Sequence, residues 1–466
     1  MRARLQSILW VLQINFYLRD EMKKILIKDA SIINEGKVVE SDLLIVGDRI
    51  ERIDREIKAE GMSTIVDAKG RWLAPGFIDD QVHFREPGLT HKGSIATESM
   101  AAIAGGTTSV MDMPNTSPPS TSREAIKNKI QYAMGKTYAN YSAYLGATNK
   151  NIEEIKALVK GDACGIKVFM GASTGNILVD DPKALEAIFE HAQIQIVTHC
   201  EDSPMIDQNI LRYKEQYGLD APPHLHAEIR SREACYKSSS YAIGLAKRHG
   251  SRLHVLHLTT EEELSLFSTG EVADKKITAE VCIHHLWFSK KDYETFGNLI
   301  KCNPSVKEES DRLALIAGLK NQTIDVVATD HAPHLMSEKQ LPYFDAPSGL
   351  PLIQHAFQML FELSGRGDFS APDAVKYACH NPAVLFGVKE RGFIREGYFA
   401  DLVLIDPEKN TIVNQDDLLY KCQWSPLENH SFSQAVSQTY LNGELVYDDG
   451  KVIGPASGRA LQFTEK

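Results

Sequence analysis

The chain has 466 residues, 43% of them hydrophobic, and a formal net charge of −11. This length exceeds one small domain, and the hydrophobic content can supply a large core. The acidic balance disfavours contact with phosphate backbones, so we predict no nucleic-acid partner. The seven cysteines are scattered and form no CxxC pair, which is typical of reduced thiols and predicts a cytoplasmic protein.

The first 21 residues resemble a signal peptide only superficially. Arg2 and Arg4 precede the apolar run 8–12, but Gln13 and Asn15 interrupt it. The run is too short to span a bilayer, and no small-residue cleavage site follows. We therefore expect residues 1–21 to be an extension outside the fold, with signal-peptide function as the alternative, and we predict no membrane association.

Both ends of the remaining chain predict β structure. Apolar and polar residues alternate in short runs within 22–74, and the same texture returns within 390–466, with an Asn442-Gly443 turn. Two separated β-rich ends suggest one small β-sandwich domain formed from both termini.

The stretch 75–389 alternates buried-type strands with helical segments, the pattern of βαβ units. Helices are predicted near 122–134, 151–159, 182–193 and 228–248. Eight candidate strands end near His83, Met113, Gly146, Phe169, His199, His257, His284 and Asp330. We predict an α/β fold class, a catalytic (β/α)8 TIM-type barrel, with its polar residues at the carboxyl ends of the strands, where such barrels carry chemistry.

The first barrel strand ends in three polar residues at every second position. Gln81, His83 and Arg85 should point the same way, into the upper rim of the barrel. A lone histidine at such a place is more often a packed or hydrogen-bonded residue. Ionisable residues also occur at the ends of later strands, and this favours a functional role for His83.

Lys167 lies within the apolar strand Gly-Ile-Lys-Val-Phe-Met. Burying its charge is costly, so the side chain either reaches solvent or an ion-pair partner, or has a function. A buried, neutral amine can take up CO2, and the resulting carbamate is an anionic oxygen ligand that can bridge two metal ions.

Further candidate ligands follow later strands. His199 ends a strand, with Glu201 on the same face. His254 and His257 are three apart and should face opposite sides of a strand; His257 is the better ligand candidate and His254 the structural one. Asp330 leaves an apolar strand as a ligand or base candidate. Imidazoles and carboxylates suit zinc, and two such ions equip a site for hydrolysis.

These motifs resemble the metal-dependent amidohydrolase superfamily and, within it, the dihydroorotases, over nearly all of the chain from Met22. The resemblance rests on PGFIDDQVHFREPG from Pro75, MDMPNTSP from Met111, GIKVFM from Gly165, VTHCED from Val197, HVLHLT from His254 and ATDHAPH from Ala328.

The resemblance implies a role for each matching residue. The implied metal ligands are His83, a carboxylated Lys167, His199, His257 and Asp330, with Asp330 also acting as the proton shuttle. Arg85 and Asn115 would hold a substrate carboxylate with help from His334, Asn303 would line the pocket, and the loop 335–351 with Gly349 would lie near the substrate. An arginine fits this role because its planar fork meets a carboxylate at two points.

One position departs from the family pattern. The family has His-x-His at the end of the first strand, and this chain has Gln81-Val82-His83. An amide oxygen binds zinc more weakly than imidazole. The ligand set of Lys167, His199 and His257 is complete, whereas the set completed by His83 and Asp330 is one ligand short, with Gln81 a weak or absent ligand. We therefore expect one or two zinc ions.

The resemblance implies reversible hydrolysis of (S)-dihydroorotate to N-carbamoyl-L-aspartate in pyrimidine biosynthesis. Hydantoins, dihydropyrimidines and allantoin are alternative substrates, but they lack the carboxylate for which Arg85 and Asn115 are suited. A catalytically inactive dihydroorotase-like subunit, perhaps beside an aspartate transcarbamoylase, is a third hypothesis that only Gln81 supports. The resemblance also implies a homodimer.

Overall fold

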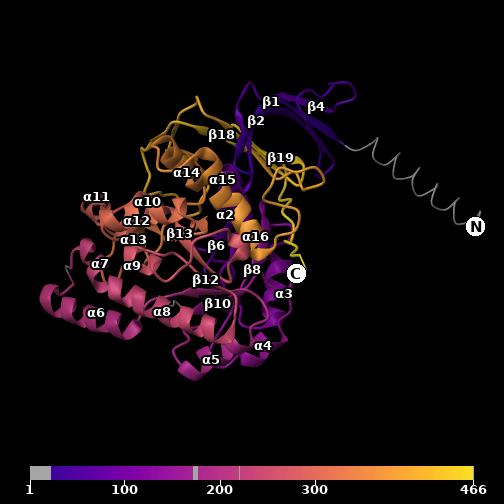
Figure 1. Ribbon diagram of the computed structural model, residues 1–466. Helices are drawn as coiled ribbons and strands as arrows, with labels where there is room; N and C mark the ends of the chain where they lie inside the picture. Colours follow the sequence, from indigo (N-terminus) through magenta and orange to yellow (C-terminus); the bar gives the residue numbers. More distant parts are fainter. Residues whose placement is uncertain (1–22, 172–176, 220, 465–466) are drawn as a thin grey trace, which may run out of the picture.

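A computed structural model describes residues 23–171, 177–219 and 221–464. The predicted extension 1–21, and with it the signal-peptide alternative, lies outside the described residues. Figure 1 shows a barrel surrounded by helices, with a β domain beside it. Among the described helices, none is both long and apolar enough to cross a lipid bilayer.

Parallel strands occupy eight successive places in the barrel wall around the core. The strands are β6 (Phe77–Val82), β7 (Thr107–Asp112), β8 (Asn140–Ala143), β9 (Leu145–Gly146), β10 (Ile166–Phe169), β11 (Ile196–His199), β12 (Leu253–Val255), β13 (Ile277–Cys282) and β14 (Val326–Ala328). They form sheets β6-β7-β8 and β9 to β14, with β8 and β9 sharing one position. Tyr144 N bonds to Asp112 O, Leu145 N to Gly165 O and His83 N to His331 O, which connects the sheets and closes the barrel. The predicted (β/α)8 barrel is confirmed.

Helices cover the outside of the barrel. They are α2 (Ile95–Ala104), α3 (Arg123–Ala133), α4 (Ile152–Ala157), α5 (Pro182–His191), α6 (Ser203–Tyr217), α7 (His226–Ile229), α8 (Arg232–His249), α9 (Glu261–Leu264), α10 (Ile283–Trp287), α11 (Tyr293–Phe296), α12 (Glu309–Lys320), α13 (Met336–Lys339), α14 (Ala356–Gly365), α15 (Ala371–Val375) and α16 (Asn381–Phe386). The longest, α8, shows why such segments are helical: the Ser231 hydroxyl caps its first turn and Gly250, at φ 68°, ends it. The four predicted helical stretches match α3, α4, α5 and α7 with α8.

The barrel strands are buried on both faces, as parallel strands in such folds are. Ile78, Met111, Val197 and Val326 come from different strands, yet they belong to one hydrophobic cluster. Residues of strands that are not neighbours can meet only inside the barrel. Phe386 of α16 joins this cluster, so that helix closes the end of the barrel at which the strands begin.

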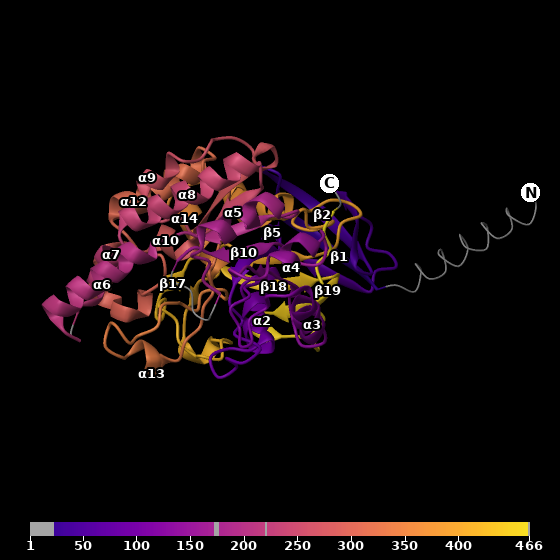
Figure 2. The same cartoon turned by 90° about the horizontal axis from the view of Figure 1, so that it is seen from below.

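Both ends of the chain build the β domain, as predicted. One nine-stranded sheet contains β1 (Lys24–Asn34), β2 (Lys37–Val46), β3 (Arg49–Asp54), β4 (Thr64–Asp67), β5 (Trp72–Pro75), β15 (Leu402–Asp406), β18 (Ala435–Leu441), β19 (Glu444–Asp448) and β20 (Lys451–Val452). The antiparallel pairing of β5 with β15 joins the two ends of the chain. The domain has its own core, which includes Ile27, Leu43 and Leu402, and Figure 2 shows it on the side of the barrel opposite α6 and α7.

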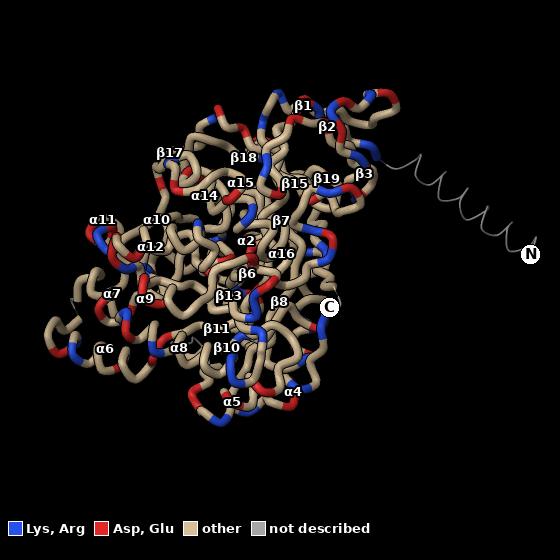
Figure 3. The backbone as a smooth tube through the Cα atoms, in the orientation of Figure 1, with Lys and Arg blue, Asp and Glu red and all other residues tan. Residues whose placement is uncertain are grey.

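The surface carries both signs of charge. Lys and Arg residues alternate with Asp and Glu residues along the peripheral helices and loops (Figure 3). The seven cysteines are buried free thiols, in agreement with the sequence prediction. The short strands β16 (Thr411–Ile412) and β17 (Ser431–Phe432) form a separate pair near the C-terminus.

Candidate active site

The predicted site residues meet in one pocket at the carboxyl ends of the barrel strands. It is lined by Gln81, His83, Arg85, Asn115, Lys167, Phe169, His199, His257, Asn303, Asp330, Ala332, His334, Ser348 and Gly349. All ten predicted site residues are among them. Phe169, Ala332 and Ser348 are additional lining residues that the sequence did not single out.

Three of the polar residues have a left-handed backbone. Arg85, His257 and Asp330 have φ values of 65°, 41° and 47°, which is uncommon for residues other than glycine and clusters at functional sites. Each follows the end of a strand, so the turn redirects its side chain toward the pocket. The expectation that His254 and His257 face opposite sides assumed one regular strand. It is wrong because β12 ends at Val255, and the side chain of His257 returns to the interior of the barrel.

Lys167 is almost fully buried, with 1% of its surface exposed. Its Nζ has no hydrogen-bond partner among the described residues and lies 4.6 Å from the centre of the Phe169 ring. Burial lowers the pKa of Lys167 to about 8. About a tenth of the amine is therefore neutral at pH 7, and the neutral amine is the form that can react with CO2.

His199 and His257 are oriented as a pair. His199 Nε2 lies 2.8 Å from Glu201 Oε2, and its Nδ1 lies 3.0 Å from His257 Nε2. Burial lowers the pKa of both histidines, and that of His257 falls well below its usual value. Both rings are therefore neutral. A neutral imidazole whose other nitrogen bonds to a carboxylate is the arrangement that metal-binding histidines adopt.

Glu201 and Arg230 support this pair, although the sequence analysis assigned neither a role. Burial alone would raise the pKa of Glu201, but Arg230 and His199 lower it to about 2. Arg230 Nη1 donates to Glu201 Oε2. The carboxylate thus stays ionised and accepts a hydrogen bond from His199 Nε2, which leaves Nδ1 with a lone pair that faces His257 Nε2. The position of Glu201 two residues after His199 was the available signal, whereas Arg230 lies in a distant segment.

Gln81, His83 and Asp330 form a hydrogen-bonded group on the other side of the pocket. Asp330 Oδ1 lies 3.1 Å from Gln81 Nε2 and 3.0 Å from His83 Nε2, and His83 Nδ1 lies 2.7 Å from Asn115 Oδ1. Burial would raise the pKa of Asp330, but its contact with His83 lowers it overall. Gln81 therefore serves here as a hydrogen-bond donor to an ionised carboxylate, with its own oxygen near Cys282 Sγ at 3.8 Å.

Arg85 and His334 form the cationic end of the pocket. Arg85 Nε donates to Pro333 O at 3.0 Å, and its Nη2 lies 3.1 Å from His334 Nε2. Lys92 Nζ lies 3.0 Å from His334 Nδ1. Burial lowers the pKa of Arg85 only to about 10, so it remains a cation, while burial and the neighbouring cations hold the pKa of His334 well below its usual value. This end of the pocket suits an anionic group.

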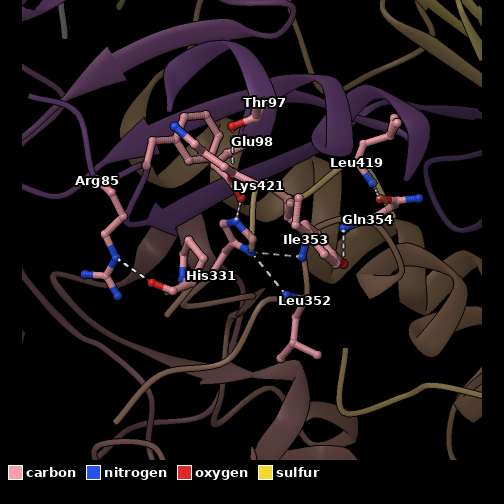
Figure 4. Close-up of polar contacts among 12 residues, drawn as sticks. Arg85, Thr97, Glu98, His331, Leu352, Ile353, Gln354, Leu419 and Lys421 are labelled. Atoms are coloured by element: carbon pink, nitrogen blue, oxygen red, sulfur yellow. Dashed lines mark hydrogen bonds and ion pairs between the residues drawn. The ribbon is translucent and has the colours of Figure 1, made fainter. Parts of the chain in front are cut away.

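The exit loop of β14 is held in place by His331, the neighbour of Asp330. Figure 4 shows His331 between Glu98 of α2 and the backbone of Leu352 and Ile353. Its Nε2 lies 2.7 Å from Glu98 Oε2, and its Nδ1 accepts from Leu352 N at 3.1 Å. The buried imidazole joins three segments and thereby fixes the backbone from which Asp330 projects.

Gly349 brings the loop 335–351 against the pocket, as predicted. Its φ is 144°, and a Cβ at this position would lie 2.5 Å from Ala332 O and 3.0 Å from His334 Cδ2. Any larger residue would therefore push the loop away from Asp330 and His334. Asn303 faces the same pocket, with an Oδ1 that has no partner among the described residues.

The donor set fits a divalent metal. Two neutral imidazoles with oriented rings, an ionised Asp330 and a buried amine without a partner surround one cavity. His199, His257, a carboxylated Lys167, His83 and Asp330 could hold the ion or ions, in agreement with the preference of zinc for nitrogen and oxygen ligands. As a free amine, Lys167 would be a protonatable group, and a carbamate on it would complete the fit.

Comparison with known proteins supports this picture. The amidohydrolase family matches residues 72–446. A dihydroorotase of Halobacterium salinarum is 32% identical over 443 residues, which cover 94% of this chain and 99% of that protein. A dihydroorotase of Staphylococcus epidermidis is 30% identical over 438 residues, covering 91% of this chain and 100% of that protein.

Solved structures agree on the fold. An L-hydantoinase (dihydropyrimidinase) from Arthrobacter aurescens has a TM-score of 0.87 at 24% identity and covers 94% of this chain and 99% of its own. A dihydropyrimidinase from Brevibacillus agri has a TM-score of 0.86 at 24% identity, covering 95% and 100%. At this identity the likeness establishes the barrel and its β domain and leaves the substrate open.

Proposed function

The chain belongs to the amidohydrolase family and is a hydrolase of the type that acts on cyclic amides. We propose that its substrate is (S)-dihydroorotate. The proposed reaction is reversible hydrolysis to N-carbamoyl-L-aspartate, a step of pyrimidine biosynthesis. The observation that carries the choice of substrate is Arg85. A buried guanidinium that stays charged, at one end of a pocket whose other end holds a hydrolytic donor set, suits a small cyclic amide with a carboxylate.

The proposed cofactor is zinc, held by His199, His257, a carbamate on Lys167, His83 and Asp330. When bound, such an ion lowers the pKa of water and polarises a carbonyl oxygen. The protein residues supply the rest. Glu201 holds His199 in the required tautomer, and the neutral state of both histidines keeps their lone pairs available.

Asp330 moves the proton. Its lowered pKa keeps the carboxylate ionised, so it can accept a proton from the attacking water. The water oxygen bonds to the ring carbonyl carbon, the carbon–nitrogen bond breaks, and Asp330 returns the proton to the departing ring nitrogen. Gln81 and His83 hold Asp330 Oδ1 from two sides, which fixes the carboxylate for both transfers.

Arg85, Asn115, Asn303 and His334 orient the substrate. Arg85 is anchored through its Nε to Pro333 O and contacts His334 through its Nη2, and its Nη1 remains for the substrate carboxylate. Holding the carboxylate at this end places the ring amide toward Asp330. The entropic cost of orienting the substrate is then met on binding and no longer adds to the barrier of the chemical step.

The test compares three rings with one enzyme preparation. We expect hydrolysis of dihydroorotate, and the reverse closure of N-carbamoyl-L-aspartate, at rates well above those with hydantoin or dihydrouracil. In Arg85→Met, kcat/KM for dihydroorotate should fall by about 10²-fold, because a charged hydrogen-bonded pair contributes about 1.5 to 3 kcal/mol or more when buried. Activity on dihydrouracil should not fall in parallel. Undiminished dihydroorotate turnover in Arg85→Met would refute the assignment.

A further inference from the structure

Three ionisable residues lie beneath the pocket and have no part in the proposed reaction. Asp80 of β6, His254 of β12 and Glu280 of β13 are each 0% exposed. In the sheet, Lys167 pairs with Val197, and Val197 pairs with His254, so His254 lies two residues below the level of His199. We refer to Asp80, His254 and Glu280 as the lower triad.

One extra residue in β6 directs Asp80 inward. Asp79 pairs with Val110 and Val82 pairs with Asp112, so three steps along β6 match two along β7. This bulge changes the alternation of the strand. Asp80 therefore faces His254, while Gln81 and His83 line the pocket above it.

The facing atoms of the lower triad are spaced as metal ligands are. His254 Nε2 lies 3.5 Å from Asp80 Oδ2 and 3.6 Å from Glu280 Oε2. These separations exceed the usual 2.7 to 3.2 Å of an N–H···O bond. Two ligands at about 2.0 to 2.2 Å from one tetrahedral ion lie about 3.3 to 3.6 Å apart. All three atoms, and Asp80 Oδ1, lack a hydrogen-bond partner within the described part of the chain.

The surrounding bonds leave these atoms free to bind a metal. Thr278 Oγ1 donates to Leu253 O at 3.3 Å and lies 2.8 Å from His254 Nδ1. Because the hydroxyl hydrogen is used, Nδ1 is the donor of that pair. Although burial opposes it, Asp80 and Glu280 raise the pKa of His254 to about 9, so without a metal Nε2 carries a proton that a bound ion would replace. Glu280 Oε1 accepts from His257 N at 3.1 Å, so Oε2 is the free oxygen. An imidazole whose second nitrogen donates to an oxygen is typical of metal sites.

We propose that Asp80, His254 and Glu280 bind a divalent transition metal ion, with zinc the best match, at a second site separate from the pocket. One imidazole and two carboxylates are ligands that zinc accepts. Two carboxylates and a divalent ion sum to zero charge, which compensates charges that are costly to bury alone. Since the ligands have no exposed surface, the ion is acquired during folding and ties β6, β12 and β13 together.

The two sites should release metal at different rates. Full-length protein from zinc-supplemented growth is incubated with dipicolinate, and the retained metal is measured by mass spectrometry. We expect the ion in the pocket to leave quickly and one ion per chain to remain until guanidinium unfolds the protein. In Lys167→Met/His199→Gln, which disables the pocket, the chelator-resistant ion should persist.

Matched variants of β6 identify the ligands. Asp80→Asn and Glu280→Gln should abolish the chelator-resistant ion. Asp79→Asn removes a neighbouring carboxylate that is equally buried but is hydrogen-bonded by Thr329, and it should retain the ion. Circular dichroism and thermal melting establish that each variant is folded.

A spectroscopic test does not depend on lower-triad variants folding. Lys167→Met/His199→Gln protein is unfolded, stripped of metal and refolded with Co²⁺, and we expect a d–d absorption band that survives chelator treatment. Folded protein without a resistant ion and without this band overturns the proposal, and the lower triad is then an ion-paired group. Retention of the ion in folded Asp80→Asn and Glu280→Gln also overturns it. Either result leaves the proposed hydrolysis untouched.

Discussion

The two sides of the candidate site differ in how far their polar atoms are already paired. Lys167, His199 and His257 form what we call the lysine side, where Lys167 Nζ and His257 Nδ1 have no hydrogen-bond partner among the residues described. Gln81, His83 and Asp330 form the glutamine side, where Asp330 Oδ1 faces both Gln81 Nε2 and His83 Nε2. On the lysine side a metal ion finds an amine without a partner and displaces one contact, between His199 Nδ1 and His257 Nε2. On the glutamine side it must displace both contacts of Asp330 Oδ1.

From this difference we infer that glutamine in place of histidine at position 81 determines which side of the site binds the first metal ion. With histidine at position 81, each side would offer two imidazoles to metal, whereas the glutamine side now offers only His83. With Gln81, an amide donor stabilises the Asp330 carboxylate in the absence of a second ion. We therefore expect the first ion on the lysine side, and the glutamine side to bind more weakly.

Removing the lysine amine should have the largest effect. In Lys167→Met we expect tightly bound zinc in the pocket to be lost and turnover to fall to the uncatalysed background, because the carbamate ligand can no longer form. Methionine fills a similar volume and removes a buried amine without a partner, so the free energy of unfolding should not decrease. Turnover of dihydroorotate and a urea melt provide the two measurements. A variant that is active with zinc would show that no lysine carbamate is needed.

Weakening the support of His199 should have an intermediate effect. Glu201→Gln keeps the shape of the side chain but removes the charge that orients His199 and pairs with Arg230. Loss of such a contact lowers metal affinity or activity by about 10- to 100-fold. Zinc titration with a competing chelator measures the change. Glu263→Gln is the matched control, since Glu263 is also buried but bonds to Ser239 and Thr260 instead. Equal losses in both variants would contradict a specific role for Glu201.

The pH dependence of activation should reveal the lysine amine itself. With a pKa of about 8, the neutral fraction of Lys167 increases about fivefold between pH 7 and pH 8, whereas an unperturbed lysine would be almost wholly protonated at both. Metal-free enzyme given bicarbonate and zinc should regain activity faster as pH rises, with a midpoint near 8. The initial rate of reactivation at constant dissolved CO2 is the measurement. A rate that stays constant from pH 7 to 9 would argue against capture by this amine.

The comparison also shows what the sequence could predict. The ends of the barrel strands follow from buried runs that finish in polar residues, and all the predicted ligands line one pocket for that reason. The sequence could not show that Arg230 supports Glu201, because the contact depends on how α7 packs against the barrel. Nor could it show that His254 and His257 both face the barrel interior, since that requires a positive φ after a three-residue strand.

The interior of the barrel was harder to predict than its rim. His254 was interpreted as structural on the assumption of regular alternation, and Asp80 received no role. Their meeting with Glu280 depends on the extra residue in β6, which no local pattern of the sequence indicates. The alternation of side chains along a strand therefore predicts well which residues reach the rim of the barrel. It predicts less well which residues meet below the rim.

Placing histidine at position 81 should have the smallest effect on turnover among these variants, and it tests the comparison directly. In Gln81→His, the added imidazole supplies a ligand that the glutamine side lacks, and we expect affinity for a second zinc ion to rise by about tenfold, the lower end of what one supporting contact at a metal site contributes. The rate should rise less, because the lysine side already holds an ion. Gln81→Ala is the control: it removes the hydrogen bond to Asp330 without adding a ligand, so zinc content should not rise while kcat falls as Asp330 loses one of its two fixing contacts. Zinc per chain and kcat, measured at increasing zinc concentration, separate the two variants. Equal zinc content in wild type and Gln81→His at every concentration would mean that the hydrogen bonds of Asp330, and not the missing imidazole, limit the second ion.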